Sequence, residues 1–66
     1  NILAGPLVEL APTFAELVTP GGMLVLSGIL EAQAARVAAA YSPYLANIEG
    51  AARDGWVRLA GRRKAR

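Results

Sequence analysis

The first third of the chain repeats apolar residues at the spacing of an amphipathic helix. Steps of three and four place an apolar stripe opposite a polar one, which predicts a helix over residues 6–18 that covers a sheet. Pro6 suits the first helical position because its missing N–H would be unpaired there. Pro12 cannot donate to the carbonyl of Val8, so we expect a kink or two short helices. The stripe comprises Leu7, Leu10, Phe14 and Leu17, flanked by Val8, Ala11, Ala15 and Val18.

A short apolar run follows a turn. Residues 19–22, Thr-Pro-Gly-Gly, end the predicted helix and turn the chain. Residues 23–26 are then all apolar, without alternation, and the run ends at Ser27 and Gly28. Such a run predicts a strand buried on both faces, as in parallel sheets that helices cover on each side.

Two further elements complete the predicted fold. An alanine-rich segment predicts a helix at residues 31–41. Residues 45–53 and 56–60 are strand candidates, and the Asp54-Gly55 pair between them is a hairpin signal. The order is therefore helix, parallel strand, helix and antiparallel hairpin, which is an α/β fold. The buried line of the second helix is expected at Leu30, Ala34, Val37 and Tyr41, with Gln33 and Arg36 facing outward.

Length and composition argue against a self-sufficient domain. Sixty-six residues permit one small domain at most, and its core alone would be marginal. The chain contains neither cysteine nor histidine, so disulfides and a structural zinc are not expected. Hydrophobic residues nevertheless make up 55% of it. We therefore expect a fragment of a larger domain without a metal site. The lack of cysteine is compatible with a cytoplasmic location.

Basic charge is concentrated at the end of the chain. The net charge is +2, and four of the seven basic residues lie within residues 62–66. This predicts a solvated basic tail rather than a basic face, with a contact to RNA or an acidic partner as the alternative. Aromatic and basic residues do not interleave, so direct nucleic-acid binding is not expected. No apolar run approaches the roughly 20 residues of a membrane span, and no membrane association is expected.

Few side chains suggest chemistry from their pattern alone. Glu9 and Glu16 lie on the polar stripe and are interpreted as a solvated face rather than a catalytic pair. Gly5 is interpreted as part of a turn and helix start rather than a ligand contact. Ser27 and Gly28 would let the chain leave the sheet tightly rather than act in catalysis. No catalytic residue is assigned. Packing is expected of the aromatic residues Tyr41, Tyr44 and Trp56.

Several segments resemble a known family in their literal residues. They are residues 1–7 (Asn-Ile-Leu-Ala-Gly-Pro-Leu), 9–12 (Glu-Leu-Ala-Pro), 26–30 (Leu-Ser-Gly-Ile-Leu), 55–57 (Gly-Trp-Val) and 61–62 (Gly-Arg). Together they resemble the class I S-adenosylmethionine-dependent methyltransferases that act on large-subunit ribosomal protein eleven. The resemblance implies the C-terminal half of a Rossmann-like class I methyltransferase sheet. Residues 1–61 would be the C-terminal part of the catalytic domain and residues 62–66 a basic tail.

The resemblance also implies an activity, a cofactor and a substrate. The family transfers methyl groups from S-adenosylmethionine to lysine side-chain amines and the N-terminal amine of the ribosomal protein. The residue at the position of Asn1 contacts the cofactor near the reacting methyl. An amine nucleophile must be desolvated, deprotonated and aligned with that methyl, so positioning matters more than a strong base. Ile2 and Leu3 replace the prolines found in many amino-group methyltransferases, which argues against the protein-glutamine and adenine-amine branches.

The resemblance limits what the chain alone is expected to do. The glycine-rich cofactor loop and the acidic ribose-binding residue of the family have no counterpart in these residues. We therefore expect no methyltransferase activity from the chain by itself. Two alternatives stay open at this point. One is another class I methyltransferase with a different substrate, and the other is a small α/β interaction module without catalysis, which would have to fold cooperatively alone.

Overall fold

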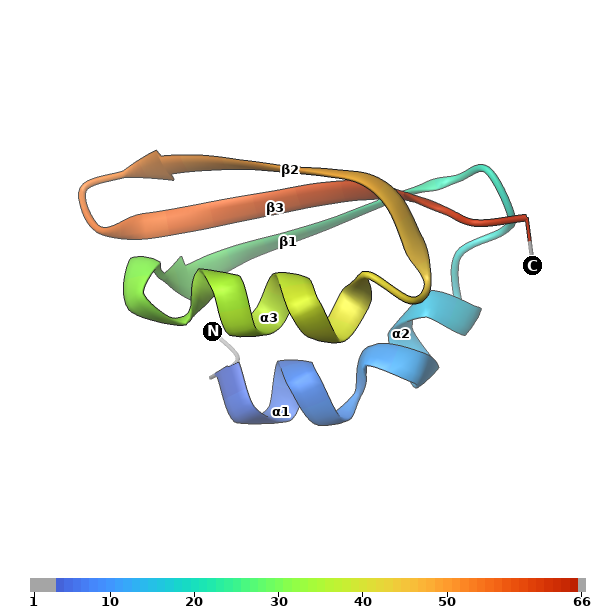
Figure 1. The fold of residues 1–66 in the computed structure, drawn as a ribbon, viewed down its shortest axis with the longest axis horizontal. Helices are drawn as coiled ribbons and strands as arrows, with labels where there is room; N and C mark the ends of the chain where they lie inside the picture. Colours follow the sequence, from blue (N-terminus) through green and yellow to red (C-terminus); the bar gives the residue numbers. More distant parts are fainter. Residues whose placement is uncertain (1–3, 66) are drawn as a thin grey trace.

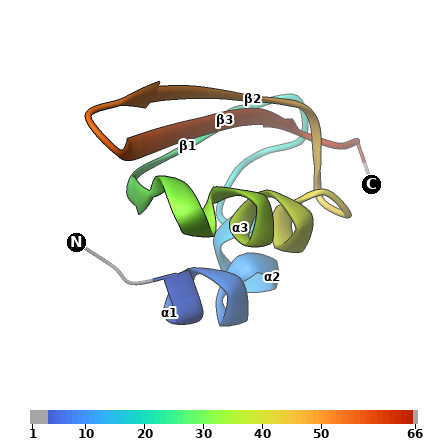
Figure 2. The ribbon, with the colours of Figure 1, turned by 60° about the vertical axis from the view of Figure 1, so that its left-hand side comes forward.

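A computed structural model describes residues 4–65, which begin with two helices and end with two strands. All three α-helices lie on one side of a three-stranded sheet (Figures 1 and 2). No helix in this part of the chain has the length and apolarity that a membrane crossing requires. The elements in chain order are α1 (Ala4–Glu9), α2 (Ala11–Glu16), β1 (Met23–Leu30), the 3-10 helix η1 (Glu31–Gln33), α3 (Ala34–Tyr41), β2 (Leu45–Arg53) and β3 (Trp56–Arg63).

The strand order of the sheet is β1-β3-β2, and β3 is antiparallel to both neighbours. The α/β class is confirmed, but the strand predicted to be parallel pairs only with β3 among residues 4–65, and it does so in antiparallel register. Because both outer strands run opposite to β3, β1 and β2 point in the same direction without touching. The segment that links them contains η1 and α3. β1 and β2 are therefore parallel to each other, and β3 is inserted between them.

The predicted hairpin is confirmed. Asp54 and Gly55 connect β2 to β3 and have φ values of 54° and 82°. Two consecutive positive φ angles are what a two-residue type I′ turn requires, and Asp-Gly adopts them readily. The second strand of the hairpin is longer than predicted, since β3 continues through Arg63 rather than ending at residue 60.

β1 is longer than the apolar run that predicted it, and it carries a bulge. Leu26 pairs with Leu59 and Ile29 with Val57, so two residues of β1 oppose Arg58 alone. Gly28 lies in this bulge with φ 75°, which a glycine adopts without strain. Ile29 and Leu30, which lie beyond the predicted strand, therefore extend it.

Burial along β1 follows one face of the sheet. Leu26 and Ile29 are buried against the helices, whereas Met23 and Val25 are 54% and 51% exposed. The prediction of a strand buried on both faces is wrong for the described chain, because helices pack on one side only. The predicted line of the second helix is confirmed at Val37 and Tyr41, while Leu30 ends β1 and is half exposed.

The predicted interruption of the first helix is confirmed, and it changes which residues are buried. Leu10 separates α1 from α2, and Pro12 occupies the first turn of α2, where no N–H is needed. The buried positions of the two helices are spaced four residues apart, so they follow only part of the predicted stripe. Leu10 and Leu17 of the predicted stripe are 39% and 77% exposed. The residues of this segment that are buried are Leu7, Ala11 and Ala15.

One buried hydroxyl joins α1 to α3. Tyr41 is almost completely buried, and its hydroxyl donates to the carbonyl oxygen of Leu7 at 2.9 Å. That carbonyl belongs to the last turn of α1, where helix carbonyls lack partners within the helix. Burial raises the pKa of Tyr41 above its ordinary value of 10.0. The hydrogen bond thus satisfies a polar group at the helix break while an aromatic ring fills the core.

The basic end of the chain has a structural role that the tail interpretation missed. Arg62 and Arg63 are the last two residues of β3. The Arg63 guanidinium donates to the carbonyl oxygens of Ala15 and Val18, the second at 2.9 Å. Its main chain exchanges hydrogen bonds of 2.8 Å with Gly21 and Gly22. A cation at a helix carboxyl end satisfies free carbonyls and opposes the helix dipole. The boundary predicted between residues 61 and 62 therefore falls inside a strand.

Replacement of Arg63 tests this role. We expect Arg63→Ala to lower the free energy of unfolding by about 1.5–3 kcal/mol, because it removes charge-assisted hydrogen bonds from a half-buried site. Urea denaturation followed by circular dichroism measures the change. Arg62→Ala is the matched control, since Arg62 is exposed and donates one hydrogen bond, to the carbonyl of Gly21. Equal losses in the two variants would contradict the assignment.

The Tyr41 hydroxyl gives a second test. Tyr41→Phe leaves the Leu7 carbonyl without this donor, and we expect a loss of about 1–3 kcal/mol at neutral pH. The folded pKa lies above the unfolded one, so the protonated hydroxyl stabilises the fold below pH 10 and this contribution declines as the pH rises further. Urea unfolding at pH 7 and above pH 10 should show the difference between wild type and Tyr41→Phe narrowing at the higher pH. A difference that does not change with pH would argue against the buried hydrogen bond.

Candidate functional site

The carboxyl ends of the two outer strands meet at one edge of the sheet. Leu30 ends β1 and Arg53 ends β2, and both pair with Trp56 at the start of β3. A single row across the sheet, Leu30–Trp56–Arg53, therefore marks this edge. In open α/β sheets, ligands bind outside the carboxyl ends of the strands. The fold thus brings residues from three separate segments to the place where a ligand is expected.

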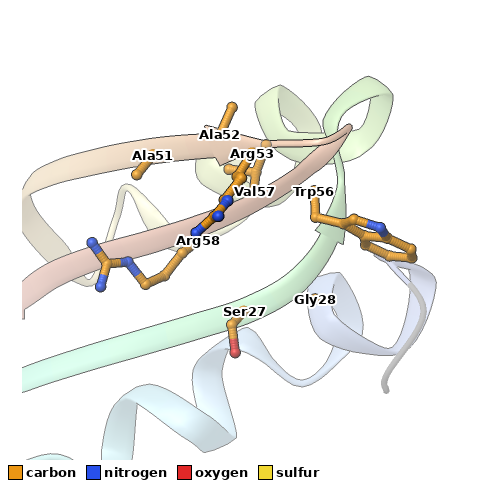
Figure 3. Close-up of a pocket in the computed structure, with 8 residues that line it drawn as sticks. All are labelled: Ser27, Gly28, Ala51, Ala52, Arg53, Trp56, Val57 and Arg58. Carbon is orange, nitrogen blue, oxygen red and sulfur yellow. The ribbon is translucent and has the colours of Figure 1, made fainter.

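The larger pocket at this edge is formed by the β1 bulge and the hairpin. It has a volume of about 450 Å³, and its lining residues include two arginines, a serine and a tryptophan. Figure 3 shows Ser27 and Arg58 on neighbouring strands, with Trp56 beside the end of the hairpin. These groups can bind an anion or stack on a planar group. The pocket is lined by Ser27, Gly28, Ala51, Ala52, Arg53, Trp56, Val57 and Arg58.

A smaller pocket joins the start of α1 to the end of β1. It has a volume of about 230 Å³ and is lined by Ala4, Gly5, Leu30, Gln33 and Arg36. Beyond its chain neighbours and the backbone of its own helix, no described atom lies within 4 Å of the position that a Cβ on Gly5 would occupy. Gly5 is part of α1, as the helix-start interpretation expected, but packing within residues 4–65 does not require a glycine there.

The residue predicted to contact the cofactor, Asn1, lies outside the described residues, so its role stays a prediction. The first described residue, Ala4, lines the smaller pocket beside the end of β1. The carboxylates Glu9 and Glu16 are both exposed, in agreement with a solvated face. Gly28 has a structural role, because its positive φ belongs to the β1 bulge. Ser27 is exposed and lines the larger pocket.

Trp56 is the site residue that the sequence interpretation missed. It was expected to pack, yet 47% of it is exposed and it lines the larger pocket. Its position in the sequence could have indicated this exposure, because Trp56 directly follows the Asp-Gly turn and is therefore the first residue of a strand. Tyr41 is buried as expected, and Tyr44 is half-buried.

The side chains that line the two pockets are mainly hydrogen-bond donors and apolar groups. Neither pocket is lined by a carboxylate, and the sequence has no histidine or cysteine. Within residues 4–65, no cluster of acidic side chains could hold a metal ion. Arginine, serine and glutamine side chains donate hydrogen bonds and shape a binding surface. The edge can therefore bind a ligand through hydrogen bonds and apolar contacts.

Comparison with known proteins gives the family. The family model described as "Ribosomal protein L11 methyltransferase (PrmA)" matches residues 1–64. A protein of that name from Pseudomonas aeruginosa strain LESB58 is 58% identical over 65 residues, which are 98% of this chain and 22% of the relative. Another, from Pseudomonas fluorescens strain SBW25, is 59% identical over 64 residues, or 97% of this chain and 22% of that protein. The chain thus spans about a fifth of the length of these relatives. It belongs to the ribosomal protein L11 methyltransferase family.

Proposed function

We propose that this chain forms part of a protein methyltransferase that transfers methyl groups from S-adenosylmethionine to the lysine side-chain amines and the N-terminal amine of a large-subunit ribosomal protein in the cytoplasm. The observation that carries the proposal is the 58% identity over nearly the whole chain to a protein named ribosomal protein L11 methyltransferase. Identity at this level favours the same substrate over another class I methyltransferase activity.

We place the chain in the C-terminal part of the catalytic domain, as one half of a Rossmann-like sheet. The support is topological. β1 and β2 run in the same direction, the connecting segment contains a helix, and the closing strand runs antiparallel between them. Open α/β sheets with this connection bind their ligands at the carboxyl edge. The two pockets lie at that edge of the chain.

The described residues suit one side of an S-adenosylmethionine site. Ala4 and Gly5 have small side chains that leave room for a ligand, Leu30 offers apolar surface, and the Gln33 amide can both donate and accept hydrogen bonds. No carboxylate lines either pocket to accept hydrogen bonds from ribose hydroxyls. This chain therefore supplies only part of the contacts. When bound, the cofactor supplies an electrophilic methyl group on its sulfonium.

In this proposal Asn1 orients the reacting groups. Its side-chain oxygen can accept a hydrogen bond from an amine, and its amide can bind the cofactor beside the reacting methyl. Correct alignment of nucleophile and methyl lowers the barrier without a strong base, because a bound neutral amine is already nucleophilic. Water exclusion and alignment are thus the contributions expected from this part of the enzyme.

The chain alone should not catalyse methyl transfer. We expect the purified 66-residue chain to leave ribosomal protein L11 unmodified in the presence of S-adenosylmethionine, because it supplies only part of the cofactor site. Mass spectrometry of the ribosomal protein measures the methyl groups added. The full-length Pseudomonas aeruginosa relative serves as the positive control. Methylation by the 66-residue chain would show that the cofactor site is complete without the rest of the family sequence.

A chimera tests Asn1 directly. This chain replaces the matching segment of the full-length Pseudomonas aeruginosa relative, and we expect the chimera to methylate ribosomal protein L11. Asn1→Ala in the chimera should lower kcat about 100-fold, the scale of a misaligned reacting group. The control Glu9→Ala changes an exposed carboxylate and should leave kcat unchanged. An active Asn1→Ala chimera would refute the role of Asn1, and an inactive parent chimera would count against the proposed function.

A further inference from the structure

The smaller pocket is built from two helices that lie side by side. Ala4 and Gly5 belong to α1, whereas Gln33 and Arg36 lie around the start of α3. Figures 1 and 2 both show α1 running along α3 on the same side of the sheet. The shape of this pocket therefore depends on the position of α1 relative to α3.

α1 is too short to hold this position by itself. It has six residues, and a helix of that length is unstable in isolation. Its position therefore depends on contacts with the rest of the fold, including the buried side chain of Leu7. Within residues 4–65, only one side-chain hydrogen bond joins α1 to another element. It is the bond from the Tyr41 hydroxyl to the Leu7 carbonyl oxygen, at 2.9 Å.

The hydrogen bond is close to the pocket on both helices. Ala4 and Leu7 are three residues apart, so they lie on the same face of α1 and about 4.5 Å apart along its axis. On α3, Arg36 precedes Tyr41 by five residues, an axial rise of about 7.5 Å. A shift of α1 that breaks the bond at Leu7 would therefore also move Ala4 relative to Arg36.

Apolar packing alone does not fix this position as closely. The partly buried residues that pack against the core include Ala4 and Val8 of α1 and Ala34 and Ala38 of α3. Such apolar contacts are not directional. A hydrogen bond is directional, because it requires a short distance and a nearly linear angle. Tyr41 is 1% exposed, so water cannot easily replace its hydroxyl as a donor when α1 moves.

We propose that Tyr41 is a positioning residue for cofactor binding, because its hydroxyl holds α1 in the place that gives the smaller pocket its shape. Tyr41 lines neither pocket and acts through the Leu7 carbonyl. The inference rests on the proposed function, since it takes S-adenosylmethionine to bind beside Ala4 and Gly5. Without the hydroxyl, α1 can occupy further positions, and the fraction of molecules ready to bind the cofactor falls.

Cofactor affinity in the chimera described above tests this role. Tyr41→Phe removes the hydroxyl and keeps the aromatic ring in the core. We expect the Kd of S-adenosylhomocysteine, the cofactor without its transferable methyl group, to rise about three- to tenfold, which is the range that the loss of one hydrogen bond allows. Isothermal titration calorimetry measures this Kd without any methyl transfer.

Two control variants separate position from stability. Ser42→Ala removes a neighbouring hydroxyl that donates to the Ala39 carbonyl at 3.0 Å and does not reach α1. Leu45→Ala removes a buried side chain at the start of β2, far along the strand from the carboxyl edge, and should destabilise the fold at least as much as Tyr41→Phe. Both control chimeras should bind S-adenosylhomocysteine with the Kd of the parent chimera.

The outcomes distinguish this inference from the proposed function. An unchanged Kd in Tyr41→Phe would overturn the positioning role, and so would an equal rise of the Kd in Leu45→Ala. A Tyr41→Phe chimera that does not fold, as judged by circular dichroism, would make Tyr41 a requirement of the fold and would overturn the role as well. A parent chimera that does not bind S-adenosylhomocysteine would instead overturn the proposed function, and the inference with it.

Discussion

The structure depends on the insertion of the last strand between two strands that do not touch each other. Among residues 4–65, β1 and β2 each pair with β3 and not with one another. The helix that connects them packs beneath the sheet but contributes no ladder hydrogen bonds. The sheet therefore cannot form until residues 56–63 are in place. Paired residues such as Met23 and Arg62 are far apart in the sequence. The chain therefore loses conformational entropy on closing the loop between them before their contacts form.

The two ends of β3 serve different parts of the molecule. At its start, Trp56 joins Leu30 and Arg53 in the row that forms the carboxyl edge. At its end, Arg63 binds carbonyls of α2 and of the turn before β1. One strand thus connects the candidate site to the helix layer. Arg62 and Arg63 donate hydrogen bonds to backbone carbonyls, a role that a charge count alone does not predict.

Local signals in the sequence predicted local structure well. The Asp54-Gly55 turn and the break before Pro12 follow from the φ angles and hydrogen bonds that those residues permit. Features that depend on distant segments were not predictable in the same way. The exposure of Val25 depends on which face the helices cover, and the role of Arg63 depends on a helix 45 or more positions away. The same holds for the candidate site: the sequence predicted that a ligand binds at the carboxyl edge of the sheet, but it did not predict that Trp56 lies there.

The composition of the carboxyl edge is consistent with a reaction that depends on alignment. The chain has no histidine or cysteine, and the two pockets have no carboxylate in their linings. A transfer that required a strong general base would need such a group nearby. The methyl transfer that we propose for the intact enzyme instead requires that the reacting atoms be held in line. In such a site, rigidity is the catalytic contribution of the scaffold. Trp56 and Arg63 lie at opposite ends of β3, so a substitution that loosens the Arg63 end should also loosen the row that Trp56 forms with Leu30 and Arg53.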